Sequence, residues 1–251
     1  MRPTNCEWLT ARPIAHRGLH DAATGVIENT ASAFAAAIAG NYGIECDVQI
    51  SADGEAMVHH DDALGRLTDG EAPLATLSTA ALKAVSFKAT ADRMLTLGEL
   101  CDLTGGRVPL VVEIKSRFDG DLRLTRRVAD VLSQYRGPAA AMSFDPEPVA
   151  TLRHLAPALT RGIVAERHYS HHEWDALTPA TKRNLACFLH APSSRPQFIA
   201  YSVKDLPAAA PWLARHVFGL PLLTWTVRSA QDRAAAQRHA DQMIFEGFLL
   251  P

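Results

Sequence analysis

The hydrophobic residues of this chain fall into short runs, which alternate with longer Ala- and Leu-rich segments carrying charges at helical spacing. The short runs predict β-strands at Pro13–His16, Gly43–Ile50, Pro109–Lys115, Ala139–Phe144, Thr160–Ala165, Gln197–Val203, Pro221–Val227 and Gln242–Phe248. The segments between them predict helices that include Thr30–Ala39, Asp121–Tyr135, Pro146–Leu155, Ala208–Phe218 and Ser229–His239. This alternation predicts parallel βα units, in a doubly wound sheet or in a TIM (β/α)8 barrel. A length of 251 residues fits the barrel, which is usually about 250 residues long.

Two stretches between the predicted strands are longer than ordinary loops. Ser51–Leu97 contains the strand-like run Ala56–His60, and Glu166–Arg195 contains a histidine-rich turn. Long excursions after barrel strands often build or cover an active site. We therefore expect one barrel domain over residues 1–251, with an insertion around 51–97.

The last predicted strand is followed by too few residues for an eighth helix. A missing helix would expose apolar residues on the outer wall of the barrel. We expect Met1–Thr10 or another copy of the chain, in a homo-oligomer, to cover this wall.

The composition narrows the partners that the chain can be expected to bind. A hydrophobic fraction of 47% and a charged fraction of 21% are ordinary for a globular protein. The formal charge of −2 gives no electrostatic reason to expect a nucleic acid or an anionic membrane. The four cysteines form no CxxC pair, which disfavours zinc and disulfides. With no signal peptide and no apolar run of about 20 residues, we expect a cytoplasmic protein without a membrane span.

Carboxylates occur at alternate positions in two of the predicted strands. Side chains alternate between the faces of a strand, so Glu45 and Asp47 share one face of Gly43–Ile50. Neighbouring buried carboxylates repel each other unless a cation compensates them, and Mg²⁺ and Ca²⁺ prefer oxygen ligands. Glu113 shares a face with Lys115 in the next strand. The combination favours a metal site, although solvent-exposed charges or structural salt bridges are the alternatives.

Two histidines lie where acid–base chemistry would be expected. His16 ends the first predicted strand, and the carboxyl ends of barrel strands surround the active site. Arg17 follows it and can hold a phosphate through its forked donors. His60 follows the apolar run Ala56-Met57-Val58 and precedes Asp61 and Asp62. With a pKa of about 6.5, two such imidazoles could deprotonate a nucleophile and protonate a leaving oxygen at a phosphorus centre.

For each of the other histidines, we expect a role in packing or on the surface. His59 should point away from His60 in an extended run, so we interpret it as structural. His168, His171 and His172 could bind a transition metal or a substrate, but their irregular spacing favours a solvated turn. The histidines for which the sequence indicates no partner are His20, His154, His190, His216 and His239.

Together, these motifs resemble those of the glycerophosphodiester phosphodiesterase family, in order and approximate spacing, over residues 12–248. The matching segments are His16-Arg17-Gly18, Glu28-Asn29-Thr30, Glu45-Cys46-Asp47, His60-Asp61-Asp62, Leu97-Gly98-Glu99-Leu100, Glu113-Ile114-Lys115, Ser143-Phe144-Asp145 and Thr224-Trp225-Thr226-Val227. Two regions depart from the family pattern. The last strand of the family usually ends in a Gly-Ile-Ile-Thr-Asp-like run, where this chain has residues 243–247, and residues 166–195 also differ.

The resemblance implies a TIM barrel that hydrolyses a glycerophosphodiester to glycerol phosphate and an alcohol. It implies one divalent cation, Mg²⁺ or Ca²⁺ with Mn²⁺ as a third candidate, and the implied ligands are Glu45, Asp47 and Glu113. It further implies that His16 and His60 are the catalytic acid and base. Arg17 and Lys115 would lie near the phosphate, and Trp225 would form an aromatic wall beside the substrate. In such an enzyme, a hydroxyl of the substrate can attack phosphorus to give a cyclic phosphate that water then opens.

Three other functions remain open from the sequence. A phospholipase-D-like cleavage of a lysophospholipid or sphingomyelin would need an apolar surface for the acyl chain. A non-catalytic phosphoester-binding barrel would have little chemical need for two histidines and three carboxylates. A carboxylate-pair glycosidase would not need the histidines.

Overall fold

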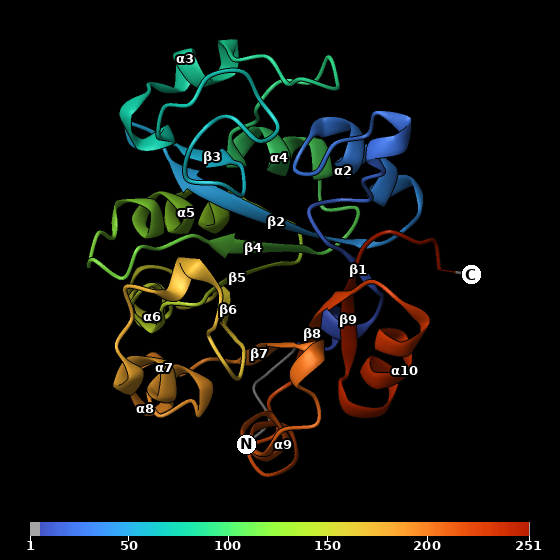
Figure 1. The fold of residues 1–251 in the computed structure, drawn as a ribbon, viewed down its shortest axis with the longest axis vertical. Coiled ribbons are helices and arrows are strands. Elements are labelled where there is room, and N and C mark those ends of the chain that lie inside the picture. The colour runs from blue at the N-terminus through green and yellow to red at the C-terminus, as the bar shows by residue number, and fades with distance from the viewer. Residues whose placement is uncertain (1–5, 251) are drawn as a thin grey trace.

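The computed structural model describes residues 6–250, whose strands form a closed barrel (Figure 1). Its eight parallel strands are β1 (Ile14–Ala15), β2 (Gly43–Ile50), β4 (Leu110–Ile114), β5 (Ala139–Ser143), β6 (Thr160–Ala165), β7 (Phe198–Ser202), β8 (Leu222–Val227) and β9 (Gln242–Phe245). β1 pairs with both β2 and β9, so the first and last strands close the barrel. The predicted TIM barrel is therefore confirmed, and the doubly wound sheet is excluded.

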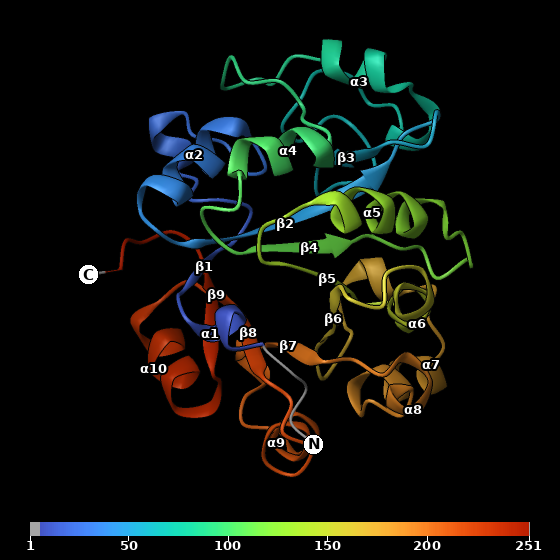
Figure 2. The ribbon, with the colours of Figure 1, turned by 180° about the vertical axis from the view of Figure 1, so that it is seen from behind.

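Helices surround the barrel, as the views from both sides show (Figures 1 and 2). The helices that follow barrel strands are α2 (Ala31–Ala39), α5 (Arg123–Gln134), α6 (Pro146–Leu155), α7 (Pro179–Ala186), α8 (Ala191–Ser194), α9 (Ala209–His216) and α10 (Ala230–His239). The short 3-10 segments are η1 (Ala22–Thr24), η2 (Leu74–Thr76), η3 (His172–Trp174) and η4 (Val203–Asp205). The helices predicted between strands are observed, with ends shifted by one or two residues.

The long excursion after β2 forms a small layer of its own at one side of the barrel. It contains β3 (Ala56–Val58), which is antiparallel to β2, then α3 (Thr79–Ala84), and it leads into α4 (Leu97–Thr104). Its apolar side chains, among them Met57, Leu74 and Phe87, form a separate buried cluster. This cluster fixes the segment that begins at His60, two residues after the end of β3.

The two faces of the strands separate the wall of the barrel from its interior. Ile44, Cys46 and Val48 of β2 are fully buried against the surrounding helices, as the alternation predicts. The interior holds a different apolar cluster, which includes Val111 of β4 and Leu223 of β8. The charged residues of β2 and β4 lie on the same face as Val111, toward the carboxyl end of the barrel.

The helix α1 (Glu7–Thr10) closes the other end of the barrel. Leu9 is 1% exposed and packs in the interior cluster, beside residues such as Ile14 and Ile244. Figure 2 shows α1 in front of β8 and β9, when the molecule is seen from behind. The prediction that Met1–Thr10 covers the outer wall is therefore wrong for α1, because its apolar residue fits the open end of the barrel. Residues 1–5 lie outside the described part of the chain.

The segment after β9 covers part of the wall that has no eighth helix. Phe248 and Leu250 pack against the outer apolar cluster, and the Tyr42 hydroxyl donates a hydrogen bond of 3.0 Å to the Leu250 carbonyl. The Phe245 ring contacts both Tyr42 and Phe248, with centroids 5.1 and 5.3 Å apart. The predicted strand Gln242–Phe248 thus ends at Phe245, and the apolar residues after it cover this part of the outer wall. Coverage by a second copy of the chain stays a prediction.

Among residues 6–250, none of the helices combines the length and the hydrophobicity that crossing a bilayer requires.

Candidate active site

Three carboxylates converge at the carboxyl end of the barrel. Glu45 and Asp47 come from β2 and Glu113 comes from β4, and the strand register places Asp47 directly beside Glu113. One oxygen from each lies within 4.8 Å of the others, and all three residues are buried. The three predicted ligands are therefore brought together in space.

The environment of Glu45 fits a cation. Its Oε1 is buried and has no hydrogen-bond partner among residues 6–250, while Oε2 accepts a bond of 3.0 Å from the Arg17 amide. Burial raises the pKa of Glu45 well above its ordinary value, and the charges of Asp47 and Glu113 raise it further. A buried carboxylate in this position needs a positive partner to stay ionised. The unused oxygen and the acidic neighbours therefore match the requirements of a hard divalent ion.

Of the three carboxylates, Asp47 has its negative charge best balanced by neighbouring positive groups. Burial alone would raise its pKa, but the charges of Lys115 and Arg17 outweigh burial and lower that pKa well below its usual range. Lys115 Nζ lies 2.7 Å from Asp47 Oδ1 and 2.5 Å from Glu113 Oε1. The Asn29 side-chain amide donates a bond of 2.9 Å to Asp47 Oδ2. Asp47 is therefore held ionised and in a fixed orientation.

The turn after β1 is shaped by close backbone contacts. Arg17 and Asn29 both have left-handed φ values, of 54° and 57°, and the Asn29 amide donates to the Arg17 carbonyl at 2.9 Å. Gly18 has φ 81°, and a Cβ at this position would lie 2.8 Å from the Ala33 backbone carbon. Only glycine fits here without strain. The neighbouring Thr30 caps α2, since its side-chain oxygen accepts a hydrogen bond from the Ala33 amide.

Arg17 and His60 are connected by a chain of charged groups. Arg17 donates to Glu28 at 2.6 Å, and Arg66 donates to the same carboxylate at 2.8 Å. Arg66 also donates to Asp61 at 2.7 Å, and Asp61 accepts a bond of 2.8 Å from Nδ1 of His60. Because an ionised carboxylate only accepts hydrogen bonds, Nδ1 of His60 is the donor in this bond, and Nε2 is left for another partner.

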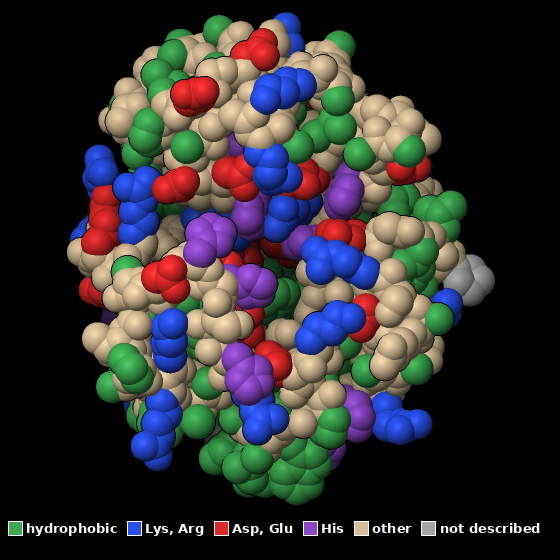
Figure 3. Space-filling view, viewed as in Figure 1, with side chains coloured by type: hydrophobic (Ala, Val, Ile, Leu, Met, Phe, Trp, Pro, Cys, Tyr) green, Lys and Arg blue, Asp and Glu red, His purple; other side chains and the backbone are tan. Residues whose placement is uncertain are grey.

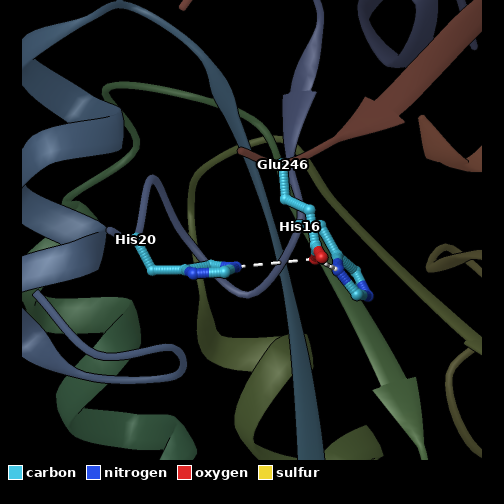
Figure 4. A group of neighbouring side chains, drawn as sticks. All are labelled: His16, His20 and Glu246. Atoms are coloured by element: carbon cyan, nitrogen blue, oxygen red, sulfur yellow. Dashed lines mark hydrogen bonds and ion pairs between the residues drawn. The ribbon is translucent and has the colours of Figure 1, made fainter. Parts of the chain in front are cut away.

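His16 has an equivalent carboxylate partner on the last strand. Its Nδ1 forms a short hydrogen bond with Glu246, and its Nε2 lies 3.9 Å from Oε2 of Glu45. His20 Nε2 lies 3.5 Å from the same Glu246 oxygen, and both imidazoles point toward this carboxylate (Figure 4). Arg228 donates to the other Glu246 oxygen at 2.6 Å. The expectation that His20 lacks a partner is therefore wrong, because barrel closure brings Glu246 to it.

The electrostatics of the pair formed by His16 and Glu246 favour a neutral His16 beside an ionised Glu246. Burial lowers the pKa of His16, although the Glu246 hydrogen bond opposes this shift. Burial alone would raise the pKa of Glu246, but hydrogen bonds from His16 and His20 lower it well below its usual range. The ionised carboxylate thus fixes the Nδ1–H tautomer of His16 and directs Nε2 toward Glu45.

Replacing Glu246 with glutamine should reduce kcat by about ten- to a hundredfold while changing KM little, since the orientation of a catalytic imidazole depends on such a partner. The substitution keeps the size of the side chain but removes the charge that fixes the tautomer. Steady-state kinetics on purified protein would measure the effect. Glu71→Gln, at an exposed glutamate in the insertion, is the matched control. Unchanged kcat in Glu246→Gln would contradict the orienting role.

Trp225 lies at the end of β8, beside a cluster of aromatic rings. Its ring is perpendicular to that of Phe144, with centroids 5.5 Å apart, and Phe144 in turn contacts Trp174 at 4.8 Å. Trp225 also lines a cavity at the mouth of the barrel together with His168 and His171. Figure 3 shows a hollow on this face, surrounded by acidic, basic and histidine side chains.

The sequence-predicted residues therefore occupy one connected region. When protonated, His60 and His16 would each lower the pKa of Asp47, so both imidazoles lie near the carboxylate cluster. His59 is 1% exposed and packs edge-on against Phe87, in agreement with its structural interpretation. The sequence interpretation missed Glu28 as the link between Arg17 and Arg66, and it missed Glu246. The signal for Glu246 was its position, directly after the strand that pairs with β1.

Comparisons with known proteins point in one direction. The family model described as the glycerophosphoryl diester phosphodiesterase family matches residues 16–249. A curated glycerophosphodiester phosphodiesterase from Caldanaerobacter subterraneus subsp. tengcongensis is 31% identical over 161 residues, which is 60% of this chain. The match spans 65% of that relative's length.

Solved structures share the fold over nearly the whole chain. A protein from Silicibacter pomeroyi DSS-3 superimposes with a TM-score of 0.73 at 25% identity, covering 93% of this chain and 89% of the other. An Oleispira antarctica phosphodiesterase, solved with the product sn-glycerol-3-phosphate, gives a TM-score of 0.73 at 19% identity, with 95% and 94% covered. The glycerophosphodiester phosphodiesterase of Thermotoga maritima gives 0.69 at 22% identity, with 92% of both chains covered.

Proposed function

Because the chain belongs to the glycerophosphoryl diester phosphodiesterase family, we propose that it hydrolyses glycerophosphodiesters to glycerol phosphate and an alcohol. The observation that carries the proposal is the cluster of Glu45, Asp47 and Glu113, within 4.8 Å of one another and next to His16. A phosphodiester needs charge compensation at its oxygens and proton transfer at the attacking and leaving groups. The cluster and its histidines supply groups for both tasks. We also propose that one domain carries the reaction, with residues 51–97 as its insertion.

The three carboxylates would hold one divalent cation, Mg²⁺ or Ca²⁺, with Mn²⁺ as a third candidate. When bound, such an ion lowers the pKa of a coordinated hydroxyl and offsets the negative charge that develops on the phosphoryl oxygens. The support for this assignment is the unpaired Glu45 oxygen, for which residues 6–250 provide no donor. Lys115, whose ammonium now compensates Asp47 and Glu113, would then be released toward the substrate phosphate.

His16 and His60 would transfer the protons. Each imidazole has its Nδ1 bonded to a carboxylate, Glu246 and Asp61 respectively, so each has Nε2 free for a substrate. A neutral Nε2 can accept a proton from an attacking hydroxyl, and a protonated one can donate to a leaving oxygen. Arg17 would hold the phosphate with the N–H groups that its bonds to Glu28 and Asp47 leave unused.

A panel of diesters tests this function directly. The purified protein is assayed with glycerophosphocholine, glycerophosphoglycerol, a lysophospholipid and sphingomyelin, each with Mg²⁺, Ca²⁺ or Mn²⁺ and with a chelator. We expect release of glycerol phosphate from the two water-soluble diesters and none after complete chelation.

Each other outcome of this assay has a definite meaning. Cleavage of the lipid substrates alone would replace the proposal by a phospholipase-D-like reaction. Tight binding of a diester without hydrolysis would indicate a non-catalytic barrel. Activity that survives complete chelation would overturn the assignment of the carboxylate cluster.

A further inference from the structure

A cavity of about 270 Å³ adjoins the candidate active site at the carboxyl ends of β6, β7 and β8. Glu166 directly follows β6, Asp205 ends η4 after β7, and Trp225 belongs to β8, and all three line it. Arg228, which also lines it, is bonded to the Glu246 carboxylate that orients His16. The ion pair between Arg228 and Glu246 therefore connects the cavity to the acid–base site. A substituent on the substrate phosphate can extend from that site into the cavity.

Glu166 is a buried acidic side chain at the edge of the cavity. It is 9% exposed, and its Oε1 has no hydrogen-bond partner within the part of the chain that the structure describes. Burial and the charges of Asp205 and Glu173 raise the pKa of Glu166, whereas the charge of His171 and the Trp174 indole lower it. An unpaired buried carboxylate is costly. No requirement of the hydrolysis explains this one.

The Lys and Arg side chains that line the cavity already have partners. Lys204 Nζ lies 2.7 Å from Asp232, and Arg228 Nε lies 2.6 Å from Glu246. Asp205 also has partners, since its Oδ2 accepts from the Arg167 amide and its Oδ1 lies 3.9 Å from His168 Nε2. An anionic ligand would have to compete with these ion pairs, whereas a cationic ligand would meet the partnerless oxygen of Glu166.

The indole of Trp225 also lines the cavity. Trp225 is half-buried, and its Nε1 has no hydrogen-bond partner among the described residues. The Trp174 indole contacts Phe144, which in turn contacts Trp225, so the ring of Trp225 is braced from behind. An alkylammonium group is attracted to the face of an indole, and a nearby carboxylate adds to this attraction.

We propose that this cavity binds the cationic headgroup of an amino-alcohol glycerophosphodiester, with Glu166 as its counter-charge and Trp225 as its aromatic wall. The ligand class is a primary or quaternary ammonium on a two-carbon alcohol, such as ethanolamine or choline. This inference rests on the proposed phosphodiesterase function and narrows its substrates.

The test compares headgroups of different charge in wild-type protein and in Glu166→Gln. The wild type should have a higher kcat/KM for glycerophosphocholine and glycerophosphoethanolamine than for neutral glycerophosphoglycerol. In Glu166→Gln, kcat/KM for the two cationic diesters should fall at least about tenfold, since a charge-assisted contact is lost. Activity on glycerophosphoglycerol should stay within about twofold, which also shows that the variant is folded. The relative loss for choline and ethanolamine distinguishes the quaternary from the primary ammonium.

Glu173→Gln is the matched control, because it removes the same charge from an exposed position in the same excursion. We expect it to leave the headgroup preference unchanged. Equal losses for neutral and cationic diesters in Glu166→Gln would overturn the inference, as would a wild-type preference for a headgroup that carries a carboxylate and no ammonium. A complete lack of hydrolysis of all diesters would instead refute the proposed function.

Binding provides a readout that is independent of turnover. The trimethylammonium proton signal of choline should broaden on adding chelator-treated wild-type protein, and the broadening should be much weaker with Glu166→Gln. Equal broadening with both proteins would count against Glu166 as the counter-charge.

Discussion

Replacing Glu45 with glutamine should reduce metal-dependent hydrolysis by at least about a thousandfold, because a bound cation stabilises developing charge by several kcal/mol. The same change should leave the metal-free protein at least as stable as the wild type. Glu45 is buried, its pKa is raised, and Oε1 has no partner among residues 6–250. Glutamine is close in shape to the protonated acid, and its oxygen can still accept the Arg17 amide.

Thermal unfolding and steady-state kinetics measure the two effects separately. Adding Mn²⁺ or Mg²⁺ should raise the Tm of the wild type, since a ligand that binds only the folded state stabilises it, and should raise that of Glu45→Gln much less. Glu71→Gln, on the surface of the insertion, should respond to the metal as the wild type does. Glu45→Gln with undiminished metal-dependent activity would show that the cation binds elsewhere.

His16→Ala and His60→Ala should each lower kcat by about a hundred- to ten-thousandfold, the usual contribution of a positioned acid or base. The two variants should differ with a diester whose leaving group is p-nitrophenol, which departs without being protonated. The variant that lacks the general acid should recover most of its rate on this substrate, whereas the variant that lacks the base should not. The experiment therefore assigns the two roles.

His154→Ala is the control for these substitutions, since His154 is an exposed residue on the outer helix α6. It should keep wild-type kinetics on both substrates. Full activity of either His16→Ala or His60→Ala on a natural diester would remove that residue from the mechanism. Equal recovery of both variants on the activated substrate would rule out separate acid and base roles.

The barrel itself could be predicted from the sequence, because its strands are short apolar runs that alternate with amphipathic segments. The predicted strand over Gly43–Ile50 has the observed bounds, and the face shared by Glu45 and Asp47 follows from the alternation alone. The helix α4 was missed, although Thr96 and Glu99 form a capping box at its start. Its sequence signal is local and was readable.

The contacts between distant segments could not be predicted in the same way. The bonds from Glu28 to Arg17 and Arg66 depend on how the insertion packs against the turn after β1, and no periodic pattern encodes that packing. The partnership of Glu246 with His16 was hidden for another reason. Closure of the barrel brings Glu246 to His16, and no local motif in residues 243–247 encodes this closure. Once β1 and β9 are paired, Ala15 faces Phe245, and the next residues on each strand are neighbours.

The seam between β1 and β9 joins the beginning and the end of the described chain. His16 Nδ1 contacts Glu246, and the His16 amide donates to the Phe245 carbonyl at 2.9 Å. During synthesis, the carboxylates of β2 and β4 emerge from the ribosome long before Glu246 does. The carboxylates of β2 and β4 can therefore come together while His16 still lacks its partner on β9. The contact between His16 and Glu246 forms only when β9 has been translated and inserted beside β1.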